Sequence, residues 1–226
     1  MSFMKGALLS CVFAFWLLPG LMSQTTGKKL YPAVRITVPP DIDGILNDEV
    51  WQTGTWTGDF TQNEPYSGRP ATQQTEFMIL FDADNIFVAI KAYDLYPDSL
   101  VNRLTRRDEV DGELAGIFID SFHDLRTAFL FGVSSAGVKY DEMYTGDGQD
   151  QDATWDPNWW VRTSVTVEGW VAEMRIPFSQ VRFEKNSGDV WGLNVVRYIY
   201  RNDELDFWQP IPKEAPGLVH LFGELT

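Results

Sequence analysis

The sequence is poor in the residues that build disulfides, metal centres and nucleophilic active sites. It holds one cysteine, Cys11, and two histidines, His123 and His220. There is no cysteine pair, no His-x-x-x-His spacing and no Gly-x-Ser-x-Gly motif. The sequence therefore lacks the residues that zinc hydrolases and serine hydrolases need for catalysis. A pair of carboxylates, as in glycosidases, is still compatible with the 32 acidic residues, but no particular pair stands out.

Positive charge is scarce as well. The chain has 18 Lys and Arg against 32 Asp and Glu, which gives a formal net charge of −14. Such an acidic protein repels phosphate backbones and anionic lipid surfaces, so nucleic acid is not an expected partner. Neutral ligands or cations fit this charge.

The one long apolar run lies at the start of the chain. Residues 1–23 are typical of a secretory signal peptide, in which Lys5 precedes an apolar stretch and we expect cleavage after Ser23. A transmembrane anchor is the alternative, but the run is short for a bilayer span. Cys11 would leave with the signal, and its position inside the apolar run does not fit a lipoprotein box. We therefore expect export to the periplasm, outer membrane or cell surface.

The remainder of the chain shows the pattern of short strands. β-Branched and aromatic residues form runs that Gly, Pro and Asx turns separate, which is typical of an all-β, antiparallel β-sandwich or jelly roll. The expected strands are 33–38, 74–82, 85–94, 114–122, 126–134, 137–144, 159–167, 170–178, 190–200, 205–210 and 219–226. We expect one short helix at 46–52, a flexible tail over 24–34 and a single domain over 35–226.

Three tryptophans crowd into the stretch DATWDPNWW, residues 152–160. By strand parity Trp159 shares the core face of its strand, and Trp160 faces outward. Trp155 lies in the loop before the strand. Outward aromatic rings beside polar side chains suit a sugar, whose C–H face stacks on a ring. Alternatively, Trp155 and Trp160 fold back over the edge of the sandwich.

An acidic loop, TGDGQDQD at 145–152, precedes these tryptophans. Asp147, Asp150 and Asp152 could together hold Ca²⁺, which prefers six to eight oxygen ligands. A solvated loop without a metal is the alternative interpretation, because the spacing is not that of an EF-hand.

Five stretches of the sequence follow one another in the order of a family 9 carbohydrate-binding module: DIDGILNDEVWQ, FDADNIFVAIKAYD, AGIFIDSF, GWVAEMRIPFSQVRF and WGLNVVRYIYRN. The sequence resembles this family, a DOMON-like β-sandwich, over nearly all of residues 35–226. Within the family it is most similar to the N-terminal module of outer-membrane β-barrel proteins of Bacteroidetes-type, Gram-negative bacteria. The resemblance implies a sandwich that binds glycans between two tryptophans and carries structural calcium.

The resemblance also implies which residues contact the sugar. The family's acidic stretch before the strand at 117–120 falls on Asp111 and Glu113, which together with Arg106 would bond sugar hydroxyls. The late tryptophan of the family matches Trp208. Its partner would fall near Val110, where this sequence departs from the family.

A ring from the acidic loop would take the place of the missing tryptophan. The expected stacking residues are therefore Trp155, Trp160 and Trp208.

The leading hypothesis is non-catalytic carbohydrate binding that serves polysaccharide capture or breakdown at the cell envelope, with a xylan- or cellulose-like glycan as ligand. An alternative is a structural or interaction module of an outer-membrane β-barrel protein, without sugar affinity. Glycosidase activity, in this chain or in a partner domain, is the third hypothesis, and no catalytic residue is assigned for it.

Overall fold

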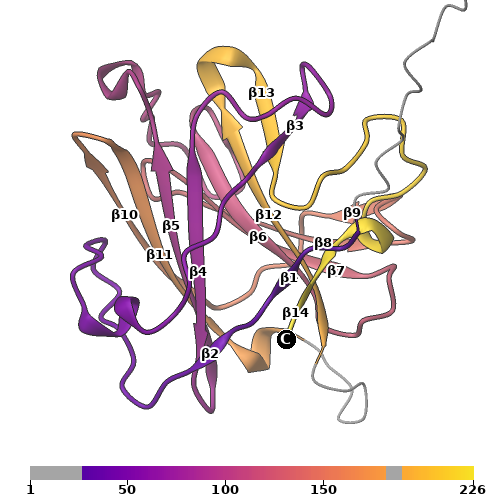
Figure 1. The fold of residues 1–226 in the computed structure, drawn as a ribbon, viewed down its shortest axis with the longest axis horizontal. Coiled ribbons are helices and arrows are strands. Elements are labelled where there is room, and N and C mark those ends of the chain that lie inside the picture. Colours follow the sequence, from indigo (N-terminus) through magenta and orange to yellow (C-terminus); the bar gives the residue numbers. More distant parts are fainter. Residues whose placement is uncertain (1–26, 182–189) are drawn as a thin grey trace, which may run out of the picture.

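The computed structural model describes residues 27–181 and 190–226, and the predicted signal peptide lies outside the described residues. The chain forms two β-sheets packed face to face, with short 3₁₀ turns between strands (Figure 1). The predicted all-β sandwich is therefore confirmed. No helix in the described part of the chain is long and apolar enough to cross a membrane.

The smaller sheet has five strands in the order β10-β11-β5-β4-β2. Their bounds are Trp160–Thr166, Gly169–Pro177, Asn85–Tyr93, Thr75–Phe81 and Val34–Arg35. β4 and β5 form one predicted hairpin and β10 and β11 the other, and β11 pairs with β5 to join them.

The larger sheet runs in the order β1-β14-β12-β6-β7-β8-β9. The bounds of these strands are Leu30–Tyr31, Gly223–Leu225, Trp191–Ile199, Leu114–Asp120, Ala128–Ser134, Lys139–Thr145 and Asp150–Asp152. Two further strands branch from β12, which pairs with β13 (Glu204–Phe207), and β13 in turn pairs with β3 (Thr61–Glu64).

Most neighbouring strands are antiparallel, as predicted. The exceptions are two short pairs at sheet edges, β1 with β14 and β2 with β4, which are parallel. Long crossovers lead to both, because the strands they join lie far apart in the sequence.

The core lies between the sheets and follows strand alternation. On β11 the residues Trp170, Ala172, Met174 and Ile176 all point inward and are buried, as predicted from their shared parity. Trp159, which precedes β10, is 1% exposed and belongs to the same core. Its predicted structural role is confirmed.

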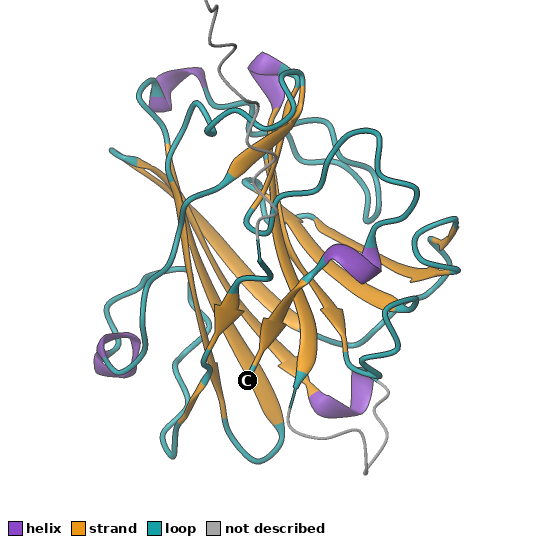
Figure 2. Cartoon of the chain, turned by 45° about the vertical axis from the view of Figure 1, so that its right-hand side comes forward, coloured by secondary structure: helices purple, strands orange, loops and turns teal. Residues whose placement is uncertain are grey.

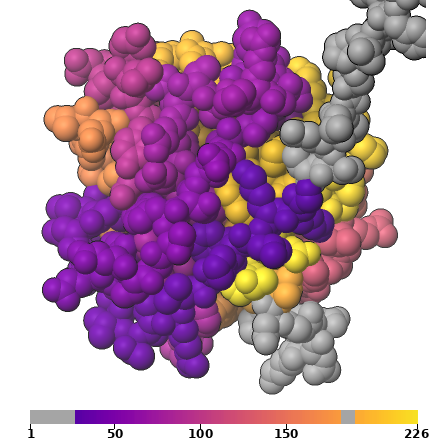
Figure 3. All heavy atoms as spheres, viewed as in Figure 1, coloured from indigo at the N-terminus to yellow at the C-terminus, as the bar shows by residue number. Residues whose placement is uncertain are grey.

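Two chain segments cover the outer faces of the sheets. Residues 36–56 lie against the smaller sheet, where Trp51 packs with Met78, Leu80 and Phe87. Figure 3 shows the indigo and purple atoms of the N-terminal half, of which this segment is one part, spread over much of one face. Residues 211–222 cover the larger sheet through Ile211, Val219 and Phe222.

Two expectations about the N-terminal half are wrong, and three short strands were not expected. The predicted tail over 24–34 is wrong from Leu30 onward, because β1 and β2 pair with the sheets and Tyr31 is buried in the core. The expected helix at 46–52 is only a 3₁₀ turn, η1 (Glu49–Gln52), packed on a sheet through Trp51. The short strands β1, β3 and β9 were not expected, since two to four residues carry no readable alternation.

Candidate functional site

Loops and turns from both sheets meet at one end of the sandwich. The long connection from β5 to β6 contains the 3₁₀ turn η2 (Pro97–Ser99), and the turn η4 (Tyr200–Asn202) follows β12. Figure 2 shows these two turns at the same end of the molecule. We call the polar and aromatic residues at this end the end cluster: Asp94, Tyr96, Arg103, Asp111, Glu113, Arg197, Tyr200 and Arg201.

A two-bond ion pair ties the two turns together. Arg201 Nη1 and Nη2 donate to the two oxygens of Asp94, at 2.5 and 2.9 Å. The hydrogen bonds to Asp94 raise the pKa of Arg201 further above its ordinary value. The guanidinium lies 5.9 Å from the centre of the Tyr96 ring, and Tyr96 is 66% exposed. An aromatic face is thus offered to solvent beside a fixed pair of charges.

A second ion pair lies at the surface of the same end. Arg103 Nη1 donates to both oxygens of Asp111, at 2.9 and 2.8 Å, and the Tyr200 hydroxyl donates to Asp111 Oδ1 at 2.8 Å. The bond from Arg103, followed by that from Tyr200, lowers the pKa of Asp111. Arg103 and Tyr200 thereby fix the position of the predicted sugar-binding residue Asp111.

Beneath these pairs, charged side chains point into the interior of the sandwich. Glu113 comes just before β6, two residues before the core residue Ala115. Arg197 lies on β12, two residues after the core residue Val195. Both side chains are fully buried. Arg197 Nη1 donates to Gln74 O and Thr75 Oγ1, at 2.9 and 3.0 Å. Burial raises the pKa of Glu113, although the charges of Arg197 and Arg201 oppose this, and burial lowers the pKa of Arg197.

Some of these buried polar atoms have no hydrogen-bond partner among the described residues. They are both carboxylate oxygens of Glu113, Nε and Nη2 of Arg197, and both oxygens of the neighbouring Asp206. Buried polar groups in folded proteins are nearly always satisfied, by protein, water or ligand. Arg197 Nη2 does lie 4.0 Å from Asp94 Oδ2, and the charges of Glu113 and Asp206 also act on Arg197, so charge attraction holds this interior together.

Asp206 adds a titrating group to this interior. Burial, together with the negative charge of Glu204, raises the pKa of Asp206 to about 8. Glu204 itself is held by Thr72, whose N–H and hydroxyl both donate to it at 2.7 Å.

Within the part of the chain that the structure describes, Arg106 makes no side-chain contact with the end cluster. It is exposed and lies next to Arg107 in the β5–β6 connection. Arg107 Nη2 donates to Asp141 on β8 at 2.8 and 2.9 Å, and it also pairs with Asp156. The second of these two arginines is therefore the one that anchors the loop to the larger sheet.

Trp155 and Trp160 lie on different surfaces of the sandwich edge. Trp155 is half-buried and packs over the inward rings of Phe129 and Phe131, at 5.0 and 5.3 Å between centroids. Trp160 is 41% exposed on the outer face of the smaller sheet, where Arg175 stacks 4.1 Å from its ring. Trp155 thus follows the alternative interpretation of a ring folded over the edge, whereas Trp160 offers an aromatic face to solvent.

Trp208 is not available for stacking. Its ring is 2% exposed and packs edge-on against Phe77 at 5.4 Å, with Lys29 5.6 Å from its centre. It follows β13 with the parity of the inward-facing Asp206, so it points into the core. The predicted role of Trp208 as a sugar platform is wrong in this structure, because neither face of the ring is open.

The acidic loop does not assemble a metal site. Asp147 accepts bonds from the backbone N–H of His220 at 3.0 Å and contacts His220 Nδ1 at 2.7 Å. Asp152 accepts from Thr154, and Asp150 is exposed. Within 27–181 and 190–226, no three His, Cys, Asp or Glu side chains form a possible metal cluster. The calcium prediction therefore stays a prediction without a ligand set.

Sequence reasoning selected Asp111 and Glu113 but missed the rest of the end cluster. The signal was present in RYIYR, residues 197–201, where two arginines occur at the end of a strand that is otherwise buried. A charged residue at an inward position of a core strand needs a buried partner of opposite charge. The sequence offers two acidic residues next to core strands, Asp94 directly after β5 and Glu113 directly before β6.

Comparison with solved structures gives relatives of the same fold. A family 9 carbohydrate-binding module from Caldicellulosiruptor kristjanssonii, solved with glucose, is 17% identical at a TM-score of 0.63, and the match covers 88% of this chain and 95% of that one. The structure of a family 9 module from the same organism with cellotriose is 17% identical at a TM-score of 0.61, and the match covers 88% of this chain and 93% of that one. A candidate carbohydrate-binding protein from Bacteroides uniformis is 15% identical at a TM-score of 0.66, and the match covers 88% of this chain and 99% of that one.

No curated protein sequence matches this chain. One family model does, and its description is carbohydrate family 9 binding domain-like. It matches residues 42–206, which include every strand from β3 to β12 and nearly all of β13. The chain therefore belongs to the carbohydrate family 9 binding domain-like family.

Proposed function

We propose that this protein binds carbohydrate without catalysis, and that the end cluster is its binding site. Membership in the family supports the ligand class. The observation that carries the choice of site is the exposed Tyr96 ring beside the Arg201–Asp94 ion pair. A pyranose offers an apolar C–H face to such a ring, and its hydroxyls suit planar charged groups.

The buried part of the cluster holds these surface groups in place. Arg197 Nη2 lies 4.0 Å from Asp94 Oδ2, beneath the Arg201–Asp94 ion pair. The outer pair of Arg103 and Asp111 supplies additional polar contacts at the surface. Glucose and cellotriose, the ligands of the Caldicellulosiruptor structures, are the first compounds to test, followed by xylan fragments.

Titration calorimetry with these saccharides tests the proposal. Tyr96→Ala should weaken binding about tenfold, because one stacked ring contributes roughly 1–1.5 kcal/mol. Tyr66→Ala is the matched control: that ring is 57% exposed, with Arg69 4.5 Å from its centre, and lies outside the end cluster. If Trp160→Ala abolishes binding and Tyr96→Ala does not, the site lies on the outer face of the smaller sheet. If the folded protein releases no heat with any saccharide, carbohydrate binding is wrong.

The proposed biological setting is the cell envelope of a Gram-negative bacterium, where the module would serve polysaccharide capture or breakdown. The sequence of residues 1–23 supports this setting. N-terminal sequencing of the protein from a periplasmic or outer-membrane fraction should find Gln24 as the first residue. Retention of Met1 in the cytoplasmic fraction would contradict it.

A second candidate function is contact with another protein, such as an outer-membrane β-barrel. Large apolar side chains lie bare around the end cluster: Leu95 is 75% exposed, Leu104 83% and Val167 91%. Exposed apolar side chains that gather on one surface mark protein interaction sites. Leu104→Ser should weaken such a complex in co-purification and leave saccharide binding unchanged.

A further inference from the structure

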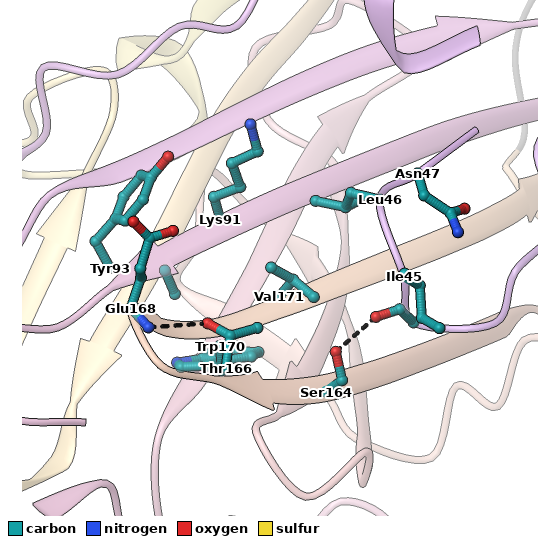
Figure 4. Close-up of a pocket in the computed structure, with 12 residues that line it drawn as sticks. Ile45, Leu46, Asn47, Lys91, Tyr93, Ser164, Thr166, Glu168, Trp170 and Val171 are labelled. Carbon is teal, nitrogen blue, oxygen red and sulfur yellow. Dashed lines mark hydrogen bonds between the residues drawn. The ribbon is translucent and has the colours of Figure 1, made fainter. Parts of the chain in front are cut away.

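The outer face of the smaller sheet carries a hollow that is distinct from the end cluster. Residues 36–56 cover only part of its outer face, and where this cover ends a depression of about 300 Å³ remains. Figure 4 shows its floor on β5, β10 and β11, with the segment Ile45–Asn47 at one end and Tyr93 and Glu168 at the other. This volume is at the lower limit of small-ligand sites, which span roughly 300–1,000 Å³.

The floor of the hollow is apolar and rigid. Val171 lies at its centre, and Leu46 and the Tyr93 ring line it (Figure 4). The hydroxyls of Ser164 and Thr166 are already engaged with the backbone of Gly44 and Glu168, and the Tyr93 hydroxyl donates to Glu76 at 3.3 Å. These internal bonds hold the floor in one conformation, so binding there would cost little ordering.

The rim, in contrast, offers polar groups that are not engaged in hydrogen bonds. Among residues 27–181 and 190–226, the side chains of Asn47, Lys91 and Glu168 have no hydrogen-bond partner. Lys91 Nζ lies 3.7 Å from the centre of the Trp56 ring, a contact that leaves its N–H groups free to donate elsewhere. The rim thus presents an ammonium donor, a carboxylate acceptor and an amide that serves as both.

We propose that this hollow is a second binding site, which takes one pyranose ring of a neutral glycan. An apolar floor inside a rim of donors and acceptors matches a ring with a C–H face and peripheral hydroxyls. The balanced pair of Lys91 and Glu168 gives an anion or a cation no net advantage, and the overall charge of −14 disfavours anions. The ligand class rests on the proposed function, whereas the location does not.

A second site would change how the protein engages a polymer. Two weak sites on one module bind separate parts of one chain, and the second contact then forms at the high effective concentration set by the first. Affinity for an insoluble glycan should therefore exceed that for a monosaccharide by far more than one site allows.

Nuclear magnetic resonance of the full protein tests the proposal, with glucose and cellotriose as probes. We expect two groups of backbone amide shifts, one in the end cluster and one at 44–47 and 164–171, which saturate independently. Val171→Glu should reduce the apparent affinity of the hollow at least tenfold and leave the shifts of the end cluster unchanged. Val38→Glu is the control for the introduced charge, because Val38 is 70% exposed and lies outside the hollow, whereas Val171 is half-buried.

Each outcome is informative. Asn47 lies in a loop rather than in the sheet, so Asn47→Ala serves as a second variant if Val171→Glu does not fold. Shifts confined to the end cluster, or shifts at 44–47 that survive both variants, would overturn the second site and leave the proposed function intact. Tyr96→Ala should weaken the saturation of the end-cluster shifts alone, about tenfold, and leave that of the hollow unchanged. An absence of shifts in both regions would overturn the second site together with the proposed function.

Discussion

The indole nitrogen of Trp159 donates a 2.8 Å hydrogen bond to the buried carboxylate of Asp141. Arg107 donates to the same carboxylate from the loop that carries Asp111 and Glu113. Burial raises the pKa of Asp141, but the bonds from Arg107 and Trp159 counteract this effect. One carboxylate of the larger sheet therefore joins the edge of the smaller sheet to the loop of the end cluster.

Trp159→Phe should destabilise the protein by about 1–3 kcal/mol. The substitution keeps an aromatic ring in the core but removes one bond from a buried acceptor. Urea unfolding followed by circular dichroism measures the loss. Trp160→Phe is the control, since that ring is 41% exposed and should change stability by less than about 0.5 kcal/mol. Equal losses in the two variants would contradict the role of the Trp159–Asp141 bond.

Stability should fall as the pH rises toward 8, because of Asp206. Burial raises the pKa of this carboxyl from 3.8 to about 8, so between these values the folded state holds a proton that the unfolded chain has released. The contribution of the neutral form is complete below pH 3.8 and is lost as the pH passes 8. The slope from this one group approaches about 1.4 kcal/mol per pH unit.

Asp206→Asn isolates this effect, because the amide imitates the protonated carboxyl at every pH. Relative to the unsubstituted protein, the variant should gain stability steadily between pH 5 and about 8 in urea unfolding experiments. A difference in stability that does not depend on pH would show that Asp206 is ionised in the folded state.

Gly112→Ala should damage the end cluster. A Cβ atom at Gly112 would lie 2.3 Å from the carbonyl oxygen of Val101, to which Glu113 N also donates at 3.1 Å. Relief of this clash must move the backbone between Asp111 and Glu113, at a cost of roughly 1–3 kcal/mol. We expect lower stability and weaker saccharide binding together. Gly27→Ala, whose Cβ would have no atom within 4 Å, should change neither.

Asp147→Asn should loosen the contact between the acidic loop and residues 217–220. Asn tolerates the left-handed backbone of this position, where φ is 65°, so the substitution tests the charge alone. Partial burial opposes a downward shift, but the hydrogen bonds from His220 outweigh it and lower the pKa of Asp147 below 3.8. The stabilisation is therefore present above pH 3.8 and is lost as the pH falls through the lowered value.

Hydrogen exchange of the His220 amide measures this contact directly, because that N–H donates to Asp147 Oδ1. Exchange should accelerate in Asp147→Asn at neutral pH and match the unsubstituted protein in strong acid. Unchanged exchange at neutral pH would contradict the prediction.

The strands of the sandwich were predictable because their alternation is long and regular. β5 and β11 are each nine residues long, and every second side chain points inward and is apolar. The sequence predicts their bounds within one residue. Edge strands were not predictable in the same way. β1 has two residues, and the strand β14 that it pairs with lies nearly 200 residues away in the sequence.

The candidate site was predictable in chemistry more than in position. Asp111 and Glu113 were selected from a resemblance, and they do lie together at one end of the sandwich. Strand parity identified Trp159 as core and Trp160 as outward, but it gave no help for Trp208, which follows the last residue of a short strand. The partners Asp94 and Arg201 are 107 positions apart, a pairing that depends on the sheet order rather than on any local pattern.

The backbone bonds around β1 and β14 have a mechanical consequence. Glu224 N donates to Lys29 O, Thr226 N to Tyr31 O and Ala33 N to Thr226 O, at 2.8, 2.9 and 2.8 Å. Because the two strands run parallel, tension applied between residue 29 and residue 226 would slide one past the other and load these bonds at the same time. A module that grips an immobile surface while its tether is pulled would gain from such a shear geometry, since bonds that share a force yield later than bonds that open one after another.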